Sequence, residues 1–192
     1  MRSGLRLALI AGIQTLVLAA MIAVRQWTLA TGVPIELETE PIDPRSLFSG
    51  DYVRLNYAIS RLTLDEVKGD TGFIRNDRVY VVLAPSGRYW KAEAISRNPP
   101  ATQLERVAIK GEVEYVSDVL WDRASNATRR VGNMGVHYGI ENYFVPEGEG
   151  LRLERTKPDE KITIQVAVDR FGNAGIKAVL INGKARYTES LF

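Results

Sequence analysis

Cysteine is absent from this chain of 192 residues, and histidine occurs once, as His137. Without cysteine the chain has no disulfide, no thiolate metal site and no cysteine nucleophile. A single histidine excludes a metal cluster of several histidines, and acid–base catalysis by histidine would depend on His137 alone. We therefore expect no metal and no other cofactor, and a fold that is stabilised by its apolar core.

A strong charge of one sign is also missing. The formal net charge is +2, and Arg2, Arg6 and Arg25 contribute to it from the N-terminal end of the chain. Elsewhere the signs alternate, as in residues 152–155, and no block of lysine and arginine stands out. The charge pattern therefore predicts no nucleic acid partner.

Long apolar runs are rare, and the clear one extends from Leu7 to Val24, apart from Gln14 and Thr15. A helix rises about 1.5 Å per residue, so a run of this length nearly crosses a hydrocarbon core of ~30 Å. Trp27 follows it, and tryptophan is enriched where a membrane meets water. The sequence therefore predicts an N-terminal transmembrane helix within residues 1–30.

The flanking residues also predict the orientation of this helix. Arg2 and Arg6 on a short leading segment favour a cytoplasmic N-terminus, which places residues 26–192 outside the cytoplasm. The alternative is a cleaved signal peptide, which needs small residues at the first and third positions before the cut. Residues 30–32, Ala-Thr-Gly, match that requirement poorly. We therefore expect an uncleaved anchor.

Most of the remaining pattern has a period of two residues. Ile35, Leu37 and Thr39 alternate with glutamates, which predicts a half-buried strand with an acidic outer face. Asn182-Gly183 and residues 85–88 predict hairpin turns. Further strands are predicted over residues 52–59, 79–84, 89–95, 107–116 (with a possible bulge at Gly111), 162–168, 176–181 and 185–187.

The pattern predicts no long helix after the anchor. Residues 61–77 are expected to be irregular with one helical turn at 64–67, residues 122–134 to form an exposed loop, and residues 151–157 a short helix or link. About eight to ten short strands predict an all-β fold, a sandwich or a partly open barrel. We expect one domain over residues 33–192, with a split into 33–120 and 135–192 as the alternative.

One octapeptide, residues 50–57, has the sequence Gly-Asp-Tyr-Val-Arg-Leu-Asn-Tyr. Together with residues 41–48, 138–148 and 176–184 it resembles the GDYXXLXY protein family. All the defining positions match, namely Gly50, Asp51, Tyr52, Leu55 and Tyr57. The resemblance covers nearly the whole region after the anchor. It implies a bacterial membrane-anchored protein, and it implies no catalytic residues.

The residues of the motif allow a structural or a binding role. In a structural role, Gly50 and Asp51 form a capped turn that leads into a strand, and Tyr52 and Tyr57 anchor its two faces. Alternating aromatic residues in strands usually belong to the core or its rim. In a binding role, a polar and aromatic patch consists of Arg45, Asp51, Tyr52, Tyr57, Tyr138 and Glu141.

An enzymatic alternative is a serine–lysine hydrolase similar to the bacterial signal peptidases, which also combine a membrane anchor with a β domain outside the cytoplasm. Ser46 or Ser49 would be the nucleophile and Lys91 the base, provided that the lysine is desolvated. The Ser-Met dipeptide of that family is absent here. We therefore favour a non-enzymatic domain at the outer face of the cytoplasmic membrane, with a membrane protein or an envelope component as its partner.

Overall fold

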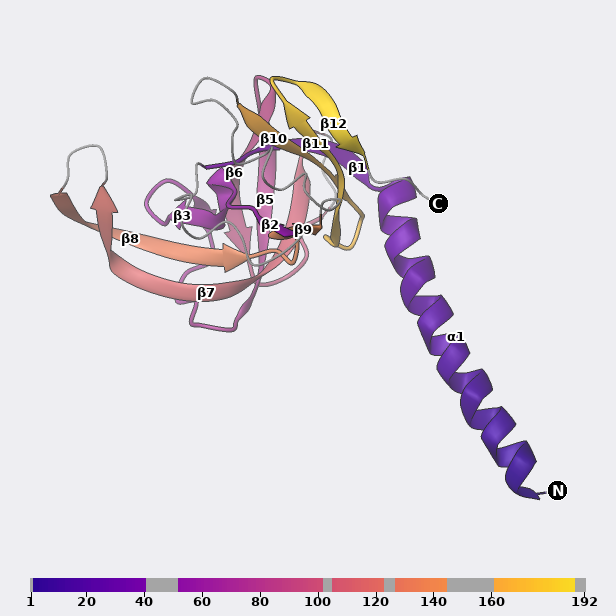
Figure 1. The fold of residues 1–192 in the computed structure, drawn as a ribbon. Coiled ribbons are helices and arrows are strands. Elements are labelled where there is room, and N and C mark those ends of the chain that lie inside the picture. Colours follow the sequence, from indigo (N-terminus) through magenta and orange to yellow (C-terminus); the bar gives the residue numbers. More distant parts are fainter. Residues whose placement is uncertain (1, 41–51, 102–104, 123–126, 145–160, 189–192) are drawn as a thin grey trace.

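The N-terminal helix projects from a body of β-strands, which it meets at its C-terminal end (Figure 1). The computed structural model describes residues 2–40, 52–101, 105–122, 127–144 and 161–188. Helix α1 spans Arg2–Thr31, and its segment Arg6–Thr31 is long and apolar enough to cross a membrane. None of its most apolar stretch is buried within the protein. This exposure is typical of a membrane anchor, because the core helix of a soluble protein would bury its apolar side chains.

Within the described residues, twelve strands form three sheets, so the predicted all-β fold with one N-terminal apolar helix is confirmed. The four-stranded sheet has the order β1 (Val33–Glu38), β10 (Ile162–Val168), β11 (Ala174–Ile181) and β12 (Lys184–Thr188). The six-stranded sheet has the order β3 (Arg61–Thr63), β8 (Ala127–His137), β7 (Val107–Asp122), β5 (Arg78–Ser86), β6 (Tyr89–Ser96) and β4 (Lys68–Gly69). A two-stranded sheet pairs β2 (Tyr52–Arg54) with β9 (Asn142–Phe144).

The two larger sheets share one apolar core. Strand β1 lies against β6, and β10 lies against β7. The first sheet contributes Ile35, Leu37 and Ile164 to the core, and the second contributes residues such as Val81 and Ile109, all of them at most 1% exposed. Removal of this apolar surface from water is the main stabilising contribution, at roughly 25 cal/mol per Å².

Strand β1 confirms the prediction that alternating residues form a half-buried strand. Its apolar face is buried, whereas Glu36 and Glu38 point away from the core and form ion pairs. Glu36 Oε1 lies 3.0 Å from Arg88 Nε, and Glu38 Oε1 lies 2.6 Å from Lys161 Nζ. The acidic face is therefore neutralised by cations from other segments of the domain.

Both predicted hairpins are confirmed. Strands β5 and β6 are joined at Gly87-Arg88, and β11 and β12 are joined at Asn182-Gly183. Asn182 and Gly183 have φ values of 49° and 78°, the left-handed conformation that a two-residue hairpin requires and that these two residue types tolerate best. The strands expected over residues 162–168 and 176–181 also pair with each other, as β10 and β11.

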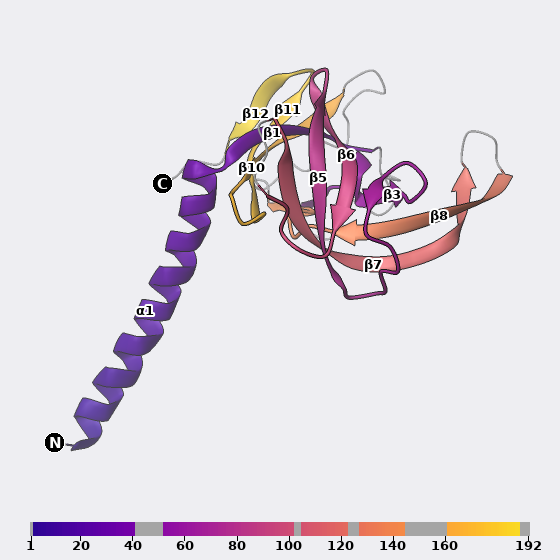
Figure 2. The same cartoon turned by 180° about the vertical axis from the view of Figure 1, so that it is seen from behind.

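The prediction of a loop over residues 122–134 is wrong for Asp122 and residues 127–134, while residues 123–126 lie outside the described residues. Strand β7 continues to Asp122, and Ala127–His137 form β8, which pairs with it antiparallel. The two long strands form a curved ribbon whose far end projects from the body, on the side away from α1 (Figures 1 and 2). The projecting part of β7 and β8 has no core to cover, so its sequence does not need to alternate apolar and polar residues. Backbone hydrogen bonds between the two strands hold this part of the ribbon together.

Other differences are local. Strand β2 ends at Arg54 rather than near Ile59, because the chain turns into a short 3-10 helix at Ala58–Ser60. The region 61–77 contains β3 and β4, and the helical turn expected at residues 64–67 is instead a non-helical turn over residues 64–66 followed by a bend. Gly111 pairs regularly with Val79, and β7 has its register shifts further along. The segment 151–157 lies outside the described residues.

Candidate functional site

The octapeptide and the second segment of the resemblance lie side by side. Strand β2 pairs with β9 in the register Tyr52 with Phe144 and Arg54 with Asn142. Directly after this pairing, the backbone N–H of Leu55 donates a hydrogen bond to the carbonyl of Glu141 over 2.6 Å. Segments some 85 residues apart in the sequence therefore form one structural unit.

Two buried tyrosines link the segments in a reciprocal way. The Tyr57 hydroxyl donates to the carbonyl of Ile140 over 2.6 Å, and the Tyr138 hydroxyl donates to the carbonyl of Ile59 over 2.7 Å. Their exposed fractions are 1% and 7%. Burial raises the pKa of both phenols well above the ordinary value, and the nearby carboxylate of Glu141 raises it further. We call this pair of hydrogen bonds the tyrosine clasp.

Glu141 lies beside the clasp and is also buried. Its Oε1 accepts a hydrogen bond of 2.5 Å from the backbone N–H of Tyr138. Its Oε2 lies 3.0 Å from Nε2 of His137, whose side chain is 55% exposed. Oε2 has no hydrogen-bond partner among the described residues, although the His137 ring is its near neighbour. Glu141 and His137 therefore converge, as acid–base chemistry at His137 would require.

The predicted binding residues are only partly brought together by the described structure. Tyr57, Tyr138 and Glu141 form one cluster, and all three are buried. The backbone of Tyr52 lies in β2 at the edge of this cluster, while Arg45 and Asp51 lie outside the described residues. The two buried tyrosines already have protein partners for their hydroxyl groups, which agrees with a structural role for them. A binding role for Arg45, Asp51 and Tyr52 stays a prediction.

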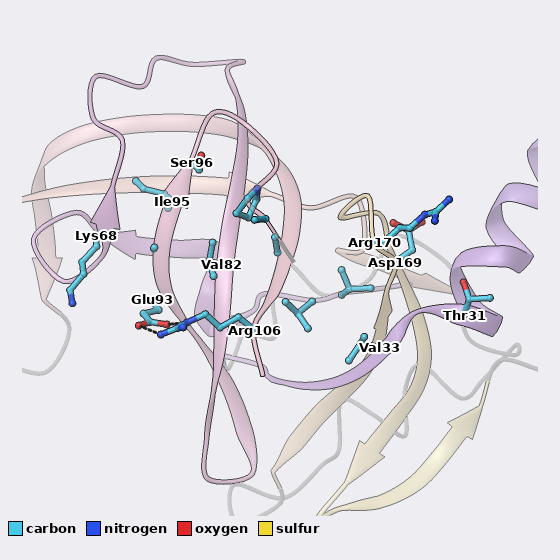
Figure 3. Close-up of a pocket in the computed structure, with 16 residues that line it drawn as sticks. Thr31, Val33, Lys68, Val82, Glu93, Ile95, Ser96, Arg106, Asp169 and Arg170 are labelled. Carbon is cyan, nitrogen blue, oxygen red and sulfur yellow. Dashed lines mark hydrogen bonds and ion pairs between the residues drawn. The ribbon is translucent and has the colours of Figure 1, made fainter. Parts of the chain in front are cut away.

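A cavity of about 540 Å³, which no sequence motif indicated, lies between the two large sheets near the end of α1 (Figure 3). Apolar side chains of both sheets, among them Val33, Val82 and Val168, form much of its wall. Its volume lies in the range of sites that bind small molecules. The lining comes from many short segments, so no local spacing in the sequence could reveal it.

The charged groups of the cavity stand at its two ends. Figure 3 shows Glu93, Arg106 and Lys68 at one end and Asp169 with Arg170 at the other. Arg106 Nε donates to Glu93 over 2.7 Å, and this hydrogen bond lowers the pKa of Glu93. The described residues contain no group of three or more histidines, aspartates and glutamates that could hold a metal ion. With apolar side chains along its wall and charged groups at its ends, the cavity is suited to an amphipathic group.

Of the residues of the enzymatic alternative, Lys91 belongs to the described part of the chain. Lys91 lies on β6 with an exposed side chain, whereas a lysine base must be desolvated. Ser46 and Ser49 lie outside the described residues. The exposure of Lys91 gives no support to a serine–lysine mechanism.

A second polar cluster, which the sequence analysis missed, attaches α1 to the β domain. Thr28 Oγ1 donates a hydrogen bond of 2.8 Å to Asp169 Oδ2, and both residues are buried. Although burial acts to raise it, the pKa of Asp169 is held below its ordinary value by hydrogen bonds from Asn173, Thr28 and backbone N–H groups. A threonine in the last turns of an anchor helix is not by itself a signal for such a contact. The cluster forms only through the folding of β10 against the end of α1.

Comparison with known proteins gives one family match. The model of the family described as GDYXXLXY protein matches residues 14–179, which include part of α1, the tyrosine clasp and most of the β domain. No curated protein and no solved structure matches the chain. The match therefore covers both halves of the unit formed by the octapeptide and residues 138–144, and it supplies no activity.

Proposed function

Since the chain belongs to the GDYXXLXY protein family, we propose that it is a single-pass protein of a bacterial cytoplasmic membrane whose β domain lies outside the cytoplasm. In this position the domain acts as an accessory or binding module for another membrane protein or an envelope component. The observation that carries the proposal is the unburied apolar helix α1, which continues almost directly into β1.

The connection between helix and domain supports this role. Only Gly32 separates α1 from β1, and the Thr28–Asp169 hydrogen bond fixes the end of the helix to the domain. A long flexible linker would let the domain reach partners far from the membrane. A short and hydrogen-bonded connection keeps the domain at the membrane surface. The partner must therefore be embedded in the membrane or lie close to it.

Two surfaces of the β domain are candidates for the contact with the partner. One is the octapeptide strand with Tyr52 and the preceding Asp51, and the other is the rim of the cavity with Lys68. A photo-crosslinking amino acid at position 52 or 68, in cells, tests both. The matched control is position 74, because Ile74 is 67% exposed and belongs to neither surface. We expect a discrete adduct with a membrane or envelope protein from position 52 or 68 and none from position 74.

A pull-down from solubilised membranes provides the complementary test. If the octapeptide strand is the binding surface, Tyr52→Ala and Asp51→Ala release the partner while circular dichroism shows an intact fold. Retention of every partner by both folded variants would remove the octapeptide from the proposal. Equal crosslinking from positions 52, 68 and 74 would remove the binding role of both surfaces.

A further inference from the structure

The turn between β10 and β11 runs alongside α1 in the direction of the membrane. At the end of β10, a Cβ atom placed on Gly32 would lie 2.9 Å from the backbone nitrogen of Val168. One residue further along the chain, Asp169 accepts the hydrogen bond of Thr28. Thr28 precedes Gly32 by about one helical turn, so the chain has moved roughly 6 Å along the helix axis towards the apolar segment.

The start of β11 contacts the same end of the helix. A Cβ atom on Gly175 would lie 2.8 Å from Leu29 Cδ2 and 3.9 Å from Arg25 Nη1. Arg25 directly follows the apolar run that ends at Val24. Residues 170–174, which connect Asp169 to Gly175, therefore lie beside the last turns of α1, about one helical turn from the end of the apolar run.

This turn is held in a fixed shape by Asp169. Its Oδ1 accepts hydrogen bonds from the backbone N–H groups of Phe171 and Asn173 over 2.8 and 3.0 Å. Its Oδ2 accepts from Asn173 Nδ2 over 3.0 Å, besides the bond from Thr28. The same carboxylate thus shapes the turn and attaches it to α1. The carbonyl of Gly172 also accepts a hydrogen bond of 2.9 Å from the N–H of Lys110, so the turn is fixed against β7 as well as against α1.

The side chains at the tip are unusual for a surface in water. Phe171 is 56% exposed, and the guanidinium carbon of Arg170 lies 4.7 Å from the centre of its ring. Trp27, on the same part of α1, is 60% exposed. Aromatic rings beside a basic residue are typical of the membrane interface, where the ring enters the headgroup layer and the cation meets lipid phosphate.

We infer that the turn of residues 170–173 is a second membrane contact, in which Phe171 enters the lipid headgroup layer and Arg170 binds lipid phosphate. The inference rests on the proposed function, because it requires that α1 crosses that membrane. A lipid surface is the occupant that the position of the turn indicates, since the turn lies beside the exit point of the helix. With two contacts, the β domain has a fixed tilt on the membrane and always presents the same face to a partner.

The full chain in lipid nanodiscs allows a test without altering the turn. Gadolinium chelated to a lipid headgroup broadens the amide signals of residues that lie in the headgroup layer. We expect strong broadening at Phe171 and Asn173 and none at Ile74, which is exposed on a loop before β5. The amide of Leu16 reports the helix separately, because it should be protected from a water-soluble relaxation agent.

Variants of Phe171 and Arg170 test whether these two side chains make the contact with the lipid. Phe171→Ser should lower the broadening at Asn173 several-fold, whereas the matched change Ile74→Ser should leave it unchanged. Arg170→Gln should lower it more in bilayers of phosphatidylglycerol than in bilayers of phosphatidylcholine. An unbroadened Phe171 signal together with a protected Leu16 would overturn the inference and leave the proposed function intact. An accessible Leu16 would overturn both.

Discussion

Tyr57 and Tyr138 each donate a hydroxyl hydrogen bond to the backbone carbonyl two residues beyond the other tyrosine. The local sequences are alike, Tyr57-Ala-Ile59 and Tyr138-Gly-Ile140. Tyr57 is the last residue of the octapeptide, so the octapeptide and residues 138–144 depend on each other for their buried hydrogen bonds. This relationship explains physically why the two segments occur together in one fold.

The tyrosine clasp predicts a loss of stability when either hydroxyl is removed. Tyr57→Phe or Tyr138→Phe leaves a buried carbonyl without its donor, which costs about 1–3 kcal/mol. Urea unfolding of the full chain in detergent micelles measures the effect. Tyr115→Phe is the matched control, because Tyr115 is 37% exposed and, among the described residues, its hydroxyl accepts one long hydrogen bond of 3.4 Å from Arg61. Equal stability of Tyr57→Phe and Tyr115→Phe would contradict this interpretation.

The raised pKa values of the same tyrosines predict alkaline unfolding. A phenol whose pKa is higher in the folded state stabilises the fold below its unfolded pKa of about 10, and this contribution is lost as the pH rises towards the folded value. Tyrosinate absorbance near 295 nm should therefore contain a component that appears only with unfolding. That component should shrink in Tyr57→Phe and again in Tyr57→Phe/Tyr138→Phe. Ionisation of all tyrosines before the loss of circular dichroism would show that the clasp is open to water.

The close packing around Gly111 predicts that a larger side chain at this position destabilises the fold. A Cβ atom there would lie 2.5 Å from Val136 Cγ1 and 3.0 Å from the carbonyl of His137, so Gly111→Ala forces β7 and β8 apart. Overpacking of this kind costs about 1–3 kcal/mol. Gly132→Ala in the same hairpin is the control, because its new methyl group would meet nothing closer than 3.4 Å. The thermal midpoint of Gly111→Ala should fall well below that of Gly132→Ala, and matching midpoints would refute the close approach.

The attachment of α1 predicts an effect on acid stability. Asp169 has a lowered pKa in the folded state, so its contribution to stability is complete above the unfolded value of about 4 and is lost as the pH falls. Thr28→Val removes one of the hydrogen bonds that lower this pKa. We expect a loss of about 1–3 kcal/mol at neutral pH and a smaller further loss on acidification than in the wild type.

The control for this experiment lies on the same helix. Thr31→Val removes a hydroxyl that bonds only to the carbonyl of Trp27 within α1 among the described contacts. Its denaturation curves at pH 7 and pH 4 should match those of the wild type. Should Thr28→Val behave like Thr31→Val at both pH values, the Thr28–Asp169 hydrogen bond has no role in joining helix and domain.

The elements that the sequence predicted correctly are those in which local chemistry and burial agree. Strand β1 alternates apolar and charged residues because one face meets the core, and Asn182-Gly183 has the one backbone conformation that a tight hairpin needs. The apolar run of α1 was equally clear, since no polar face competes with it. In each case a few neighbouring residues are enough to predict the element.

The missed elements depend on distant partners. Strand β8 contains polar residues and arginines because part of its length lies on a projecting ribbon, and only its pairing with β7 makes it a strand. The two hydrogen bonds of the clasp join residues that are 83 and 79 positions apart, and the Thr28–Asp169 contact joins residues that are 141 positions apart. Spacing along the chain gives no measure of such approach. The repeated Tyr-x-Ile of the clasp is a weak signal that gains meaning only from the structure.

The central claim is that α1 holds the β domain at the outer face of a cytoplasmic membrane. Fusion of alkaline phosphatase or green fluorescent protein to the C-terminus, expressed in a bacterium, tests it most directly. We predict an active phosphatase, a dark fluorescent protein, and retention of both fusions in the membrane fraction after an alkaline carbonate wash. A fluorescent fusion with an inactive phosphatase, or release of the chain into the wash, would contradict the account.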